Sequence, residues 1–472
     1  MNTVFGIALG GILLGAGFAA PVLLAVFIVK LRQSASDWLR KSAPVETLTL
    51  FNKVTWRDYF ESNLRADTGK ATQRPFGTNA HFFKWDQIQL TPGYLSRQPL
   101  SSDTPINTQV TVGPKAEKPL TLKVPLLVSA MAYGNALSYQ AKMALAKASV
   151  LTGTADNTGG GPLVEQARAV ADQYIIQFNK GFWSKTAPLL SQADMIEIAI
   201  GHGAYDSAPV RISGQKVIGG FARRLGTIPG LDIVLESRVP EVEDLNDWKN
   251  LILRLKKVTG GVPIAAKLGG THYLEQELDF IIQGGIDAIV LDGAEAGTHA
   301  CPSTLQDDVG LPLLPALCRT VKYLENQKLK GRITLLAGGG LATPGDFVKC
   351  LALGADAVYI GTVAALVMSH TQVTKATPWE PPTGILYYDA KEAQKYNPDL
   401  GAKHLYNYYE SCFLEIKQAA RALGKNDLQE LDKSDLVALD REYAEMAGIM
   451  YMGNTNPPRS NNFTTEDIFQ QP

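Results

Sequence analysis

Short apolar runs alternate with segments of helical periodicity through the middle of the chain, from Val124 to Met368. Such runs, bounded by turn residues, are typical of strands buried on both faces of a parallel sheet. Eight runs fit this description: Pro125–Met131, Tyr174–Phe178, Met195–Ile200, Leu231–Leu235, Pro263–Leu268, Ala288–Leu291, Ile333–Ala337 and Ala357–Ile360. Helical periodicity occurs at Leu137–Val150, Leu245–Lys257, Leu274–Gln283, Leu313–Glu325 and Asp346–Leu353. The pattern predicts parallel strands separated by helices.

Eight strands alternating with helices over about 250 residues are the size and rhythm of a (β/α)8 TIM barrel. We therefore predict an α/β fold with that barrel at residues 124–368. Residues 31–123 are interpreted as an N-terminal collar with a small β element. Residues 369–453 are interpreted as a C-terminal loop and helical extension, with helices expected at 405–423 and 434–446, and residues 454–472 as a flexible tail.

The first thirty residues follow a different pattern. Val4 to Val29 is an uncharged apolar run, long enough for a helix to cross a hydrocarbon core of about 30 Å. Because the bases Lys30 and Arg32 follow the run, the positive-inside rule places its C-terminal side in the cytoplasm. We expect residues 1–30 to be a single-pass anchor in the inner membrane, with the barrel on the cytoplasmic side. The alternative is a cleaved signal peptide, which normally has a positive residue before the apolar run.

Composition narrows the function classes. The 472 residues include 45 Lys and Arg against 46 Asp and Glu, without a long basic run, so nucleic acid is not an expected partner. The four cysteines lie far apart and form no zinc motif. We expect no metal site, and the cysteines suit a reducing compartment better than a disulfide framework.

Two glycine-bearing turns follow the last two predicted strands. Gly338, Gly339 and Gly340 come after one strand, and Gly361 and Thr362 after the next. In TIM barrels the loops after strands seven and eight commonly bind phosphate, and backbone N–H groups at such turns can converge on one anion. The turns therefore predict a phosphate site. The alternative is a pair of ordinary strand-to-helix turns.

Titratable residues at the predicted strand ends are candidates for chemistry. Lys267 lies on an otherwise apolar strand, where a buried ammonium needs an anion or a polarised oxygen nearby. A structural salt bridge is the alternative for this lysine. His299 can exchange a proton near neutral pH, although a lone histidine is more often a structural, hydrogen-bonded residue. Cys301 has no visible paired base, which argues against a nucleophilic role.

At these residues the chain resembles the FMN-binding domain of glutamate synthases, without their glutaminase domain. The resemblance runs from about Pro125 to Met368 and is carried by Ser129–Gly134, Asn157–Gly159, Tyr174–Gln177, Ile196–Ile198, Lys267–Leu268, Gly297–Thr298 and Gly338–Leu341. It implies FMN as the cofactor. The phosphate would lie at the two glycine turns, and Lys267 would favour the anionic reduced ring.

The resemblance also implies roles for individual residues. Cofactor-binding residues would be Ser129, Ala130, Met131, Asn157, Lys267, Gly297, Gly338, Gly339, Gly340, Gly361 and Thr362. Catalytic candidates are Lys267, with His299 or His202 as the proton donor. Substrate-binding candidates are Gln177, Glu197 and Arg211.

The chain departs from the family at two places. Members usually carry a cysteine triplet after the last strand that ligates an iron-sulfur cluster, whereas Ser369 to Gly384 has no cysteine, so we predict FMN without a cluster. In the substrate loop, Ala199 and Tyr205 stand where members typically have lysines, and His202 where they have glutamine. Because a dicarboxylate needs cationic donors, the family substrate is in doubt; Arg211, Arg223 or Arg224 are candidate replacements.

The function predicted from the sequence is an FMN-dependent oxidoreductase of glutamate synthase type. It would aminate 2-oxoglutarate with ammonia or catalyse a related amine or imine redox reaction. We expect a small-molecule substrate, an unidentified electron donor, a membrane and possible homo-oligomers as partners. The alternative is a repurposed, inactive FMN-binding membrane protein. An FMN barrel acting on hydroxy acids or isoprenoids would need a His/Arg arrangement that the sequence does not reveal.

Overall fold

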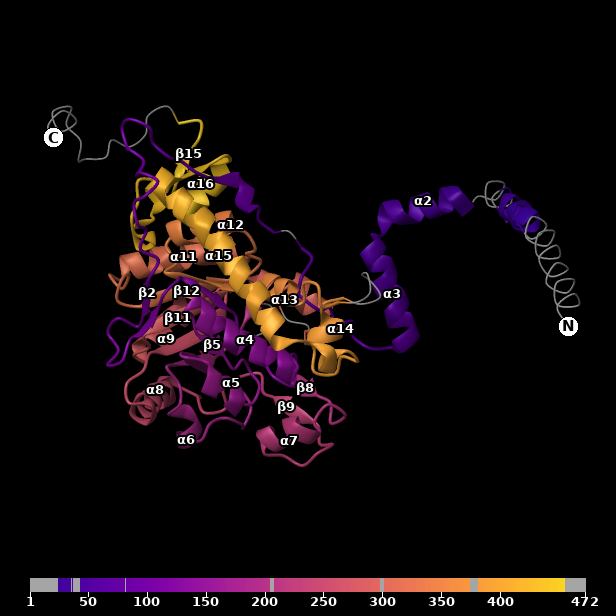
Figure 1. Cartoon of the computed structure of the whole chain (residues 1–472), viewed down its shortest axis with the longest axis horizontal. Coiled ribbons are helices and arrows are strands. Elements are labelled where there is room, and N and C mark those ends of the chain that lie inside the picture. The colour runs from indigo at the N-terminus through magenta and orange to yellow at the C-terminus, as the bar shows by residue number, and fades with distance from the viewer. Residues whose placement is uncertain are drawn as a thin grey trace, which may run out of the picture. The chain divides into compact units, whose positions relative to one another are not determined.

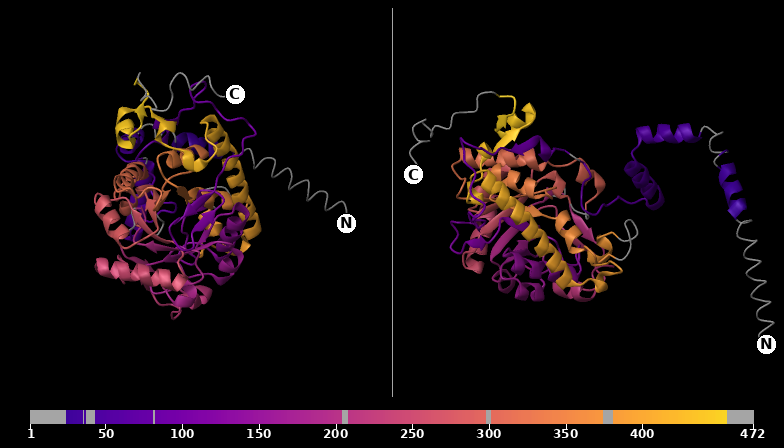
Figure 2. Two further views of the ribbon diagram at one scale, coloured as in Figure 1. Left: turned by 90° about the vertical axis from the view of Figure 1, so that its left-hand side faces the viewer. Right: turned by 45° about the horizontal axis from the view of Figure 1, so that its top comes forward.

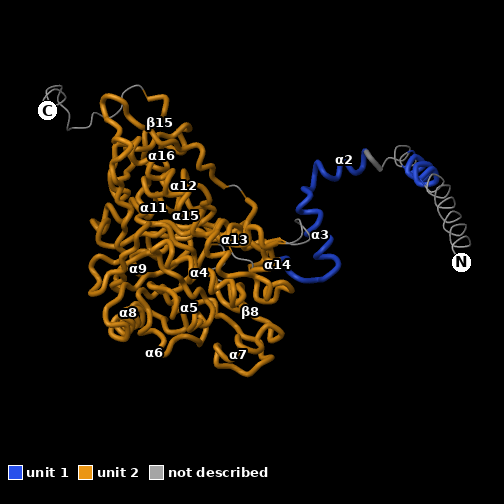
Figure 3. The backbone as a smooth tube through the Cα atoms, viewed as in Figure 1, with its two compact units in different colours: residues 1–72 blue, residues 73–472 orange. Residues whose placement is uncertain are grey.

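The computed structural model describes residues 24–34, 36, 43–80, 82–203, 208–297, 301–373 and 381–454. The chain divides into two compact units, residues 1–72 and 73–472 (Figure 3). The first unit contains α2 (Ala43–Lys53) and α3 (Trp56–Thr68). Helix α3 begins after Thr55, whose side chain accepts a hydrogen bond from the backbone N–H of Asp58, and ends at Gly69 with a left-handed φ of 62°.

The predicted membrane anchor is not supported. No helix in the described part of the chain is long and apolar enough to cross a membrane. Residues 24–34 are helical, about half of the roughly 20 residues that a spanning helix needs. The rest of the predicted span, from Val4 to residue 23, lies outside the described residues. This finding overturns the predicted single-pass location in the inner membrane with the barrel on the cytoplasmic side.

An eight-stranded parallel sheet is the centre of the second unit. Its strands, in spatial order, are β4 (Leu126–Val128), β13 (Ala357–Ile360), β12 (Thr334–Gly338), β11 (Ala288–Asp292), β10 (Ile264–Gly269), β7 (Met195–Ala199), β6 (Tyr174–Phe178) and β5 (Asp156–Asn157). Figure 2 shows these strands at the centre with helices around them. The architecture is a TIM-like α/β near-barrel, which confirms the α/β prediction at that level.

Helices follow most of these strands, and the longer ones pack around the sheet (Figure 1). They are α4 (Tyr139–Thr152), α5 (Glu165–Val170), α6 (Ala187–Leu190), α7 (Gly219–Leu225), α8 (Leu245–Thr259), α9 (Leu274–Gln283), α10 (Ser303–Asp307), α11 (Leu313–Asn326), α12 (Pro344–Ala352) and α13 (Thr362–Met368), with a 3-10 turn η3 at Ala294–Ala296. In α8, Trp248, Leu251 and Leu255 recur at helical spacing and are buried, while the intervening Lys249 is exposed.

The sheet differs from the sequence prediction at two strands. Leu231 to Leu235 was predicted as a barrel strand, but Ile233–Leu235 forms β9, which pairs antiparallel with β8 (Val210–Ile212) outside the sheet. The barrel strand β5 at Asp156–Asn157 was not predicted. Two polar residues give no apolar run, and β5 is defined by its pairing with β6 and by the ion pair of Asp156 with Lys142.

The remaining elements pack around the near-barrel. An antiparallel pair, β2 (Val110–Val112) and β3 (Leu120–Leu122), precedes β4. Helix α15 (Pro398–Ala422) packs against α4 and α13 (Figure 1). A three-stranded sheet joins β1 (Ile88–Leu90), β14 (Leu436–Ala438) and β15 (Met450–Tyr451). The other short elements are η1 (Trp85–Gln87), α14 (Thr383–Leu386), η4 (Ala393–Lys395), η5 (Leu428–Glu430), η6 (Lys433–Asp435) and α16 (Arg441–Ala447).

Candidate active site

A cavity of about 750 Å³ opens at the carboxyl ends of the parallel strands. Predicted site residues that line it are Ser129, Ala130, Met131, Gln177, His202, Lys267, Gly297, Gly338, Gly339, Gly340, Gly361 and Thr362. They come from chain segments as far apart as residues 129 and 362, and parallel strands bring them to one edge of the sheet. The volume is within the usual range for a cofactor or small-molecule site.

The two glycine turns lie side by side because β12 and β13 are neighbouring strands. Gly339 has a φ of 138° and Gly340 a φ of 69°, values that other residues adopt at a cost. A Cβ at Gly339 would lie 3.2 Å from the backbone N of Gly293, whereas one at Gly361 would have no described heavy atom within 4 Å. The turns therefore present bare backbone to the cavity, as an anion site requires.

Lys267 lies on β10 with its side chain only 2% exposed. Its Nζ is 3.1 Å from Asp292 Oδ2, at the end of the neighbouring β11, and donates to Ser129 Oγ at 3.3 Å. Burial raises the pKa of Asp292 to about 6, although the ammonium of Lys267 opposes that shift. The sequence left a salt bridge and a cofactor contact as alternatives for Lys267; the structure contains the salt bridge and also places the lysine on the cavity wall.

Glu197 is fully buried on β7, beneath the cavity. Its carboxylate accepts hydrogen bonds from Gln177 Nε2 at 2.7 Å, Tyr359 OH at 3.0 Å and Asn157 Nδ2 at 3.3 Å. Gln177 and Tyr359 line the cavity, whereas Glu197 and Asn157 are not among its lining residues. Glu197 thus reaches the cavity through its two partners, and Asn157, predicted as a direct cofactor contact, lies one layer deeper.

The two candidate histidines have different outcomes. His202 lines the cavity, and burial together with the positive charges of Lys267 and Lys180 lowers its pKa to about 3. It is therefore a neutral imidazole near pH 7. His299 lies outside the described residues, as do Thr298 and Tyr205.

Arg211 is not brought to the cavity. It lies on β8, its side chain is 70% exposed, and its Nη1 is 3.2 Å from Asp232 Oδ2. The two other candidate cations, Arg223 and Arg224, belong to α7, and neither lines the cavity. The side chain of Arg224 lies over the rings of Tyr133 and Tyr139.

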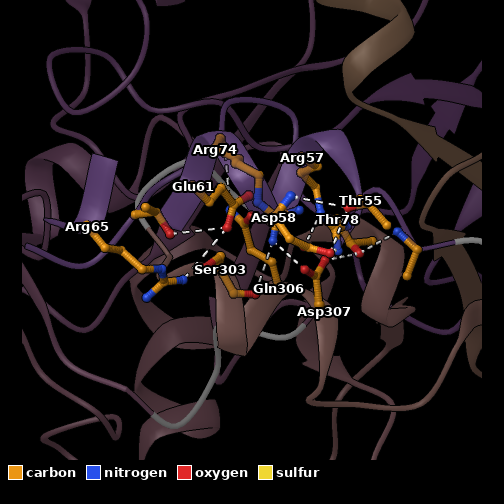
Figure 4. Close-up of polar contacts among 12 residues, drawn as sticks. Thr55, Arg57, Asp58, Glu61, Arg65, Arg74, Thr78, Ser303, Gln306 and Asp307 are labelled. Atoms are coloured by element: carbon orange, nitrogen blue, oxygen red, sulfur yellow. Dashed lines mark hydrogen bonds and ion pairs between the residues drawn. The ribbon is translucent and has the colours of Figure 1, made fainter. Parts of the chain in front are cut away.

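Sequence reasoning missed the part of the cavity wall that comes from before the barrel. Phe76, Phe82, Phe83 and Trp85 line the cavity. Asp307, at the end of α10, holds the start of this segment: it pairs with Arg74, and Thr78 Oγ1 donates to it at 2.6 Å (Figure 4). The scattered aromatics between residues 76 and 85 were the only signal, and they have no periodicity that indicates a position.

Sequence comparison gives the family. Residues 87–426 match the conserved region in glutamate synthase. The chain is 30% identical over 432 residues to the glutamate synthase large subunit-like protein of Rhizobium meliloti (strain 1021), covering 87% of this chain and 97% of the relative. It is 32% identical over 311 residues to the archaeal glutamate synthase (NADPH) of Archaeoglobus fulgidus, covering 66% of this chain and 61% of that relative. The second relative is thus spanned over less than two thirds of its length.

The residues present fit FMN. Glycines without side chains form two adjacent turns for its phosphate, and the small residues Ser129 and Ala130 leave room beside β4 for a flat ring. Lys267 supplies a buried positive charge in the same cavity. The described residues contain no group of three or more His, Cys, Asp or Glu side chains that would hold a metal ion. By its sequence match and its site, the chain belongs to the glutamate synthase family and is an FMN-dependent oxidoreductase.

Proposed function

We propose that this protein interconverts a 2-oxo acid plus ammonia with the corresponding amino acid. For the family substrate, 2-oxoglutarate, the product is glutamate. The observation that carries the proposal is that the glycine turns, Lys267 and Gln177, which is held by the buried Glu197, line one cavity in a chain that matches the glutamate synthase region. The names of the relatives supply the reaction class.

The reaction balances in two stages. The oxo acid condenses with ammonia to an imine and releases water. The imine carbon then takes up a hydride and its nitrogen a proton, which together reduce the C=N bond to an amine. When bound, FMN supplies the two-electron chemistry, because its reduced form can deliver a hydride to carbon. An unidentified electron donor must return two electrons after each turnover.

In this proposal, the chain's own residues supply a fixed positive charge and orient the side chains that line the cavity. The ammonium of Lys267, fixed by Asp292 and Ser129, would stabilise the negative charge that a flavin bound in this cavity gains on reduction. Glu197 orients Gln177 and Tyr359, whose side chains line the cavity, through two hydrogen bonds of 2.7 and 3.0 Å. The aromatic residues between Phe76 and Trp85 exclude water, which would otherwise hydrolyse an imine.

The partners follow from this chemistry. Ammonia would come from solution or from a separate partner. A separate electron donor and homo-oligomers complete the proposed partners. Of the two catalytic histidines proposed from the sequence, His202 would act as a neutral hydrogen-bonding group near pH 7, and His299 keeps its proposed role as proton donor.

The experiment uses the purified full-length chain with its flavin reduced in the absence of oxygen. Ammonia and 2-oxoglutarate are added together, and flavin absorbance and amino acid formation are followed. Reoxidation with one amino acid formed per flavin supports the proposal. If no oxo acid reoxidises the flavin with ammonia, and no amino acid reduces it, the protein is the inactive FMN-binding alternative. Oxo acid without ammonia is the control.

A further inference from the structure

Among the described residues that line the cavity, the Lys and Arg side chains are Lys180 and Lys267. Lys267 bonds Asp292 and Ser129 and lies next to the barrel strands. Lys180 follows the end of β6, and its Nζ donates to the backbone carbonyl of Ser237 at 2.9 Å. That carbonyl follows β9, so the hairpin outside the sheet helps to fix the position of this ammonium.

Ala199, directly after the part of β7 that pairs with β6, stands where family members typically carry a lysine. Lys180 follows β6, the strand that pairs with β7. β6 and β7 pair in parallel with Gln177 opposite Glu197 and Phe178 opposite Ile198. Asn179 and Ala199 are the next positions of the two strands, and Ala199 lines the cavity. Lys180, two residues beyond the end of β6, therefore supplies a cation to the cavity wall that also contains Ala199.

Around Lys180, the described cavity-lining residues supply no further Lys or Arg apart from Lys267. Arg211 is on the surface and pairs with Asp232. Glu236, adjacent to the carbonyl that holds Lys180, lines the cavity, and so does Glu295. A second carboxylate on the substrate would meet these carboxylates rather than a cation, at a cost in electrostatic energy. Leu235 and the aromatic wall from Phe76 to Trp85 offer apolar surface instead.

We propose that Lys180 binds the carboxylate of the substrate, and that the substrate is a 2-oxo acid or amino acid with one carboxylate and an uncharged, apolar side chain. The proposal rests on the proposed function and departs from it in the substrate: 2-oxoglutarate becomes a poor one. Burial, with the charges of Lys267 and Lys180, lowers the pKa of His202, so both ammonium groups act on the same part of the cavity wall.

The test compares 2-oxoglutarate with 2-oxohexanoate, an acid of similar length in which an uncharged ethyl group replaces the distal carboxylate. Reduced protein is mixed with ammonia and each acid, and flavin reoxidation is followed. Binding to the oxidised protein is measured separately from flavin absorbance changes. We expect kcat/KM for 2-oxohexanoate to exceed that for 2-oxoglutarate by about tenfold or more, the size of effect that one unpaired charge produces. Equal or better use of 2-oxoglutarate overturns the proposed substrate class.

The variant K180M tests the residue. Loss of one charge-assisted hydrogen bond should raise the dissociation constant of 2-oxohexanoate about 10- to 100-fold and leave FMN bound. K180R, which keeps the charge, should recover most of the affinity. K249M removes the same charge from the exposed face of α8 and should change nothing. Unchanged binding in K180M overturns the assignment, and if that variant fails to fold, K180Q serves in its place.

The two proposals fail differently. If neither acid reoxidises the flavin, the proposed function fails. Binding of 2-oxohexanoate that depends on Lys180 would then still support the carboxylate site, and binding that does not depend on it would overturn that site.

Discussion

The near-barrel has two halves that differ in how they build the site. From β10 to β13, the cavity is made by backbone turns and by one ion pair between adjacent strand ends, Lys267 and Asp292. From β5 to β7, it is made by side chains, among them Gln177 and Lys180, supported by a hairpin outside the sheet. The first half suits a constant ligand with a phosphate. The second half can change its chemistry by single substitutions, so cofactor and substrate specificity are separable in this fold.

The largest expected effect comes from the backbone half. In G339D a side chain is forced onto a residue with a φ of 138°, and a carboxylate enters the phosphate site. We expect FMN affinity to fall more than about 100-fold, measured as flavin retained after gel filtration. G345D, in the first turn of α12, adds the same side chain at a permissive position and should retain FMN. Full flavin retention in G339D would mean that the turns do not hold the phosphate.

The ion pair gives the next effect. In K267M, Asp292 is left buried without its partner, which we expect to cost about 3–5 kcal/mol of unfolding free energy. Loss of the cation also disfavours the reduced, anionic cofactor, so the midpoint potential should become more negative by roughly 30–60 mV. The double variant K267M/D292N should recover stability but not the potential. A K267M protein with bound FMN and an unchanged potential would remove the electrostatic role of this lysine.

The substrate half has a predicted pH signature. His202 has a pKa of about 3 in the folded chain and an ordinary value near 6.5 when unfolded. The unfolded chain therefore binds the proton first, and folding stability falls as the pH drops below 6.5. Linkage predicts a loss of about 2 kcal/mol between pH 7 and pH 5 from this residue. Denaturant unfolding at the two pH values checks it, and H202N should show a correspondingly smaller pH dependence than the parent chain.

The smallest effect is expected on the outer hairpin. Arg211 is exposed and its pair with Asp232 is on the surface, so R211A should change stability by about 0.5 kcal/mol or less. Its steady-state constants should match those of the parent chain. A tenfold higher KM in R211A would instead mean that Arg211 contacts the substrate. The division of the site between the two halves would then be wrong.

The sequence predicted the backbone half well for a physical reason. Strands β10 to β13 are largely apolar runs, and the glycines and isolated charges in or after them, such as Lys267, have few structural alternatives. The other half was harder to predict because β5 is two polar residues, defined by pairing rather than by hydrophobicity. The run at 231–235 was assigned to the barrel in its place. One strand was missed and one was wrongly added, both before β10, so the number of strands up to β10 stayed correct. Lys267 was therefore still placed on the fifth strand, and the glycine turns after the seventh and eighth.

The arrangement of the site residues, as distinct from their identity, depends on tertiary contacts that the sequence could not reveal. The hydrogen bonds of Glu197 join residues from four strands, and no spacing in the chain encodes them. The position of Arg211 depends on whether its segment enters the sheet, which one apolar run could not decide.

Thr78 and Arg74 are attached to Asp307, and these contacts hold the segment that closes one side of the cavity. The residues of this wall, from Phe76 to Trp85, precede the first barrel strand in the sequence. A shortened chain beginning after Trp85 would therefore keep every strand of the near-barrel and lose that wall. Such a chain would admit bulk water to its reacting groups. Its reduced flavin should be reoxidised in side reactions, even where the affinity for FMN is unchanged.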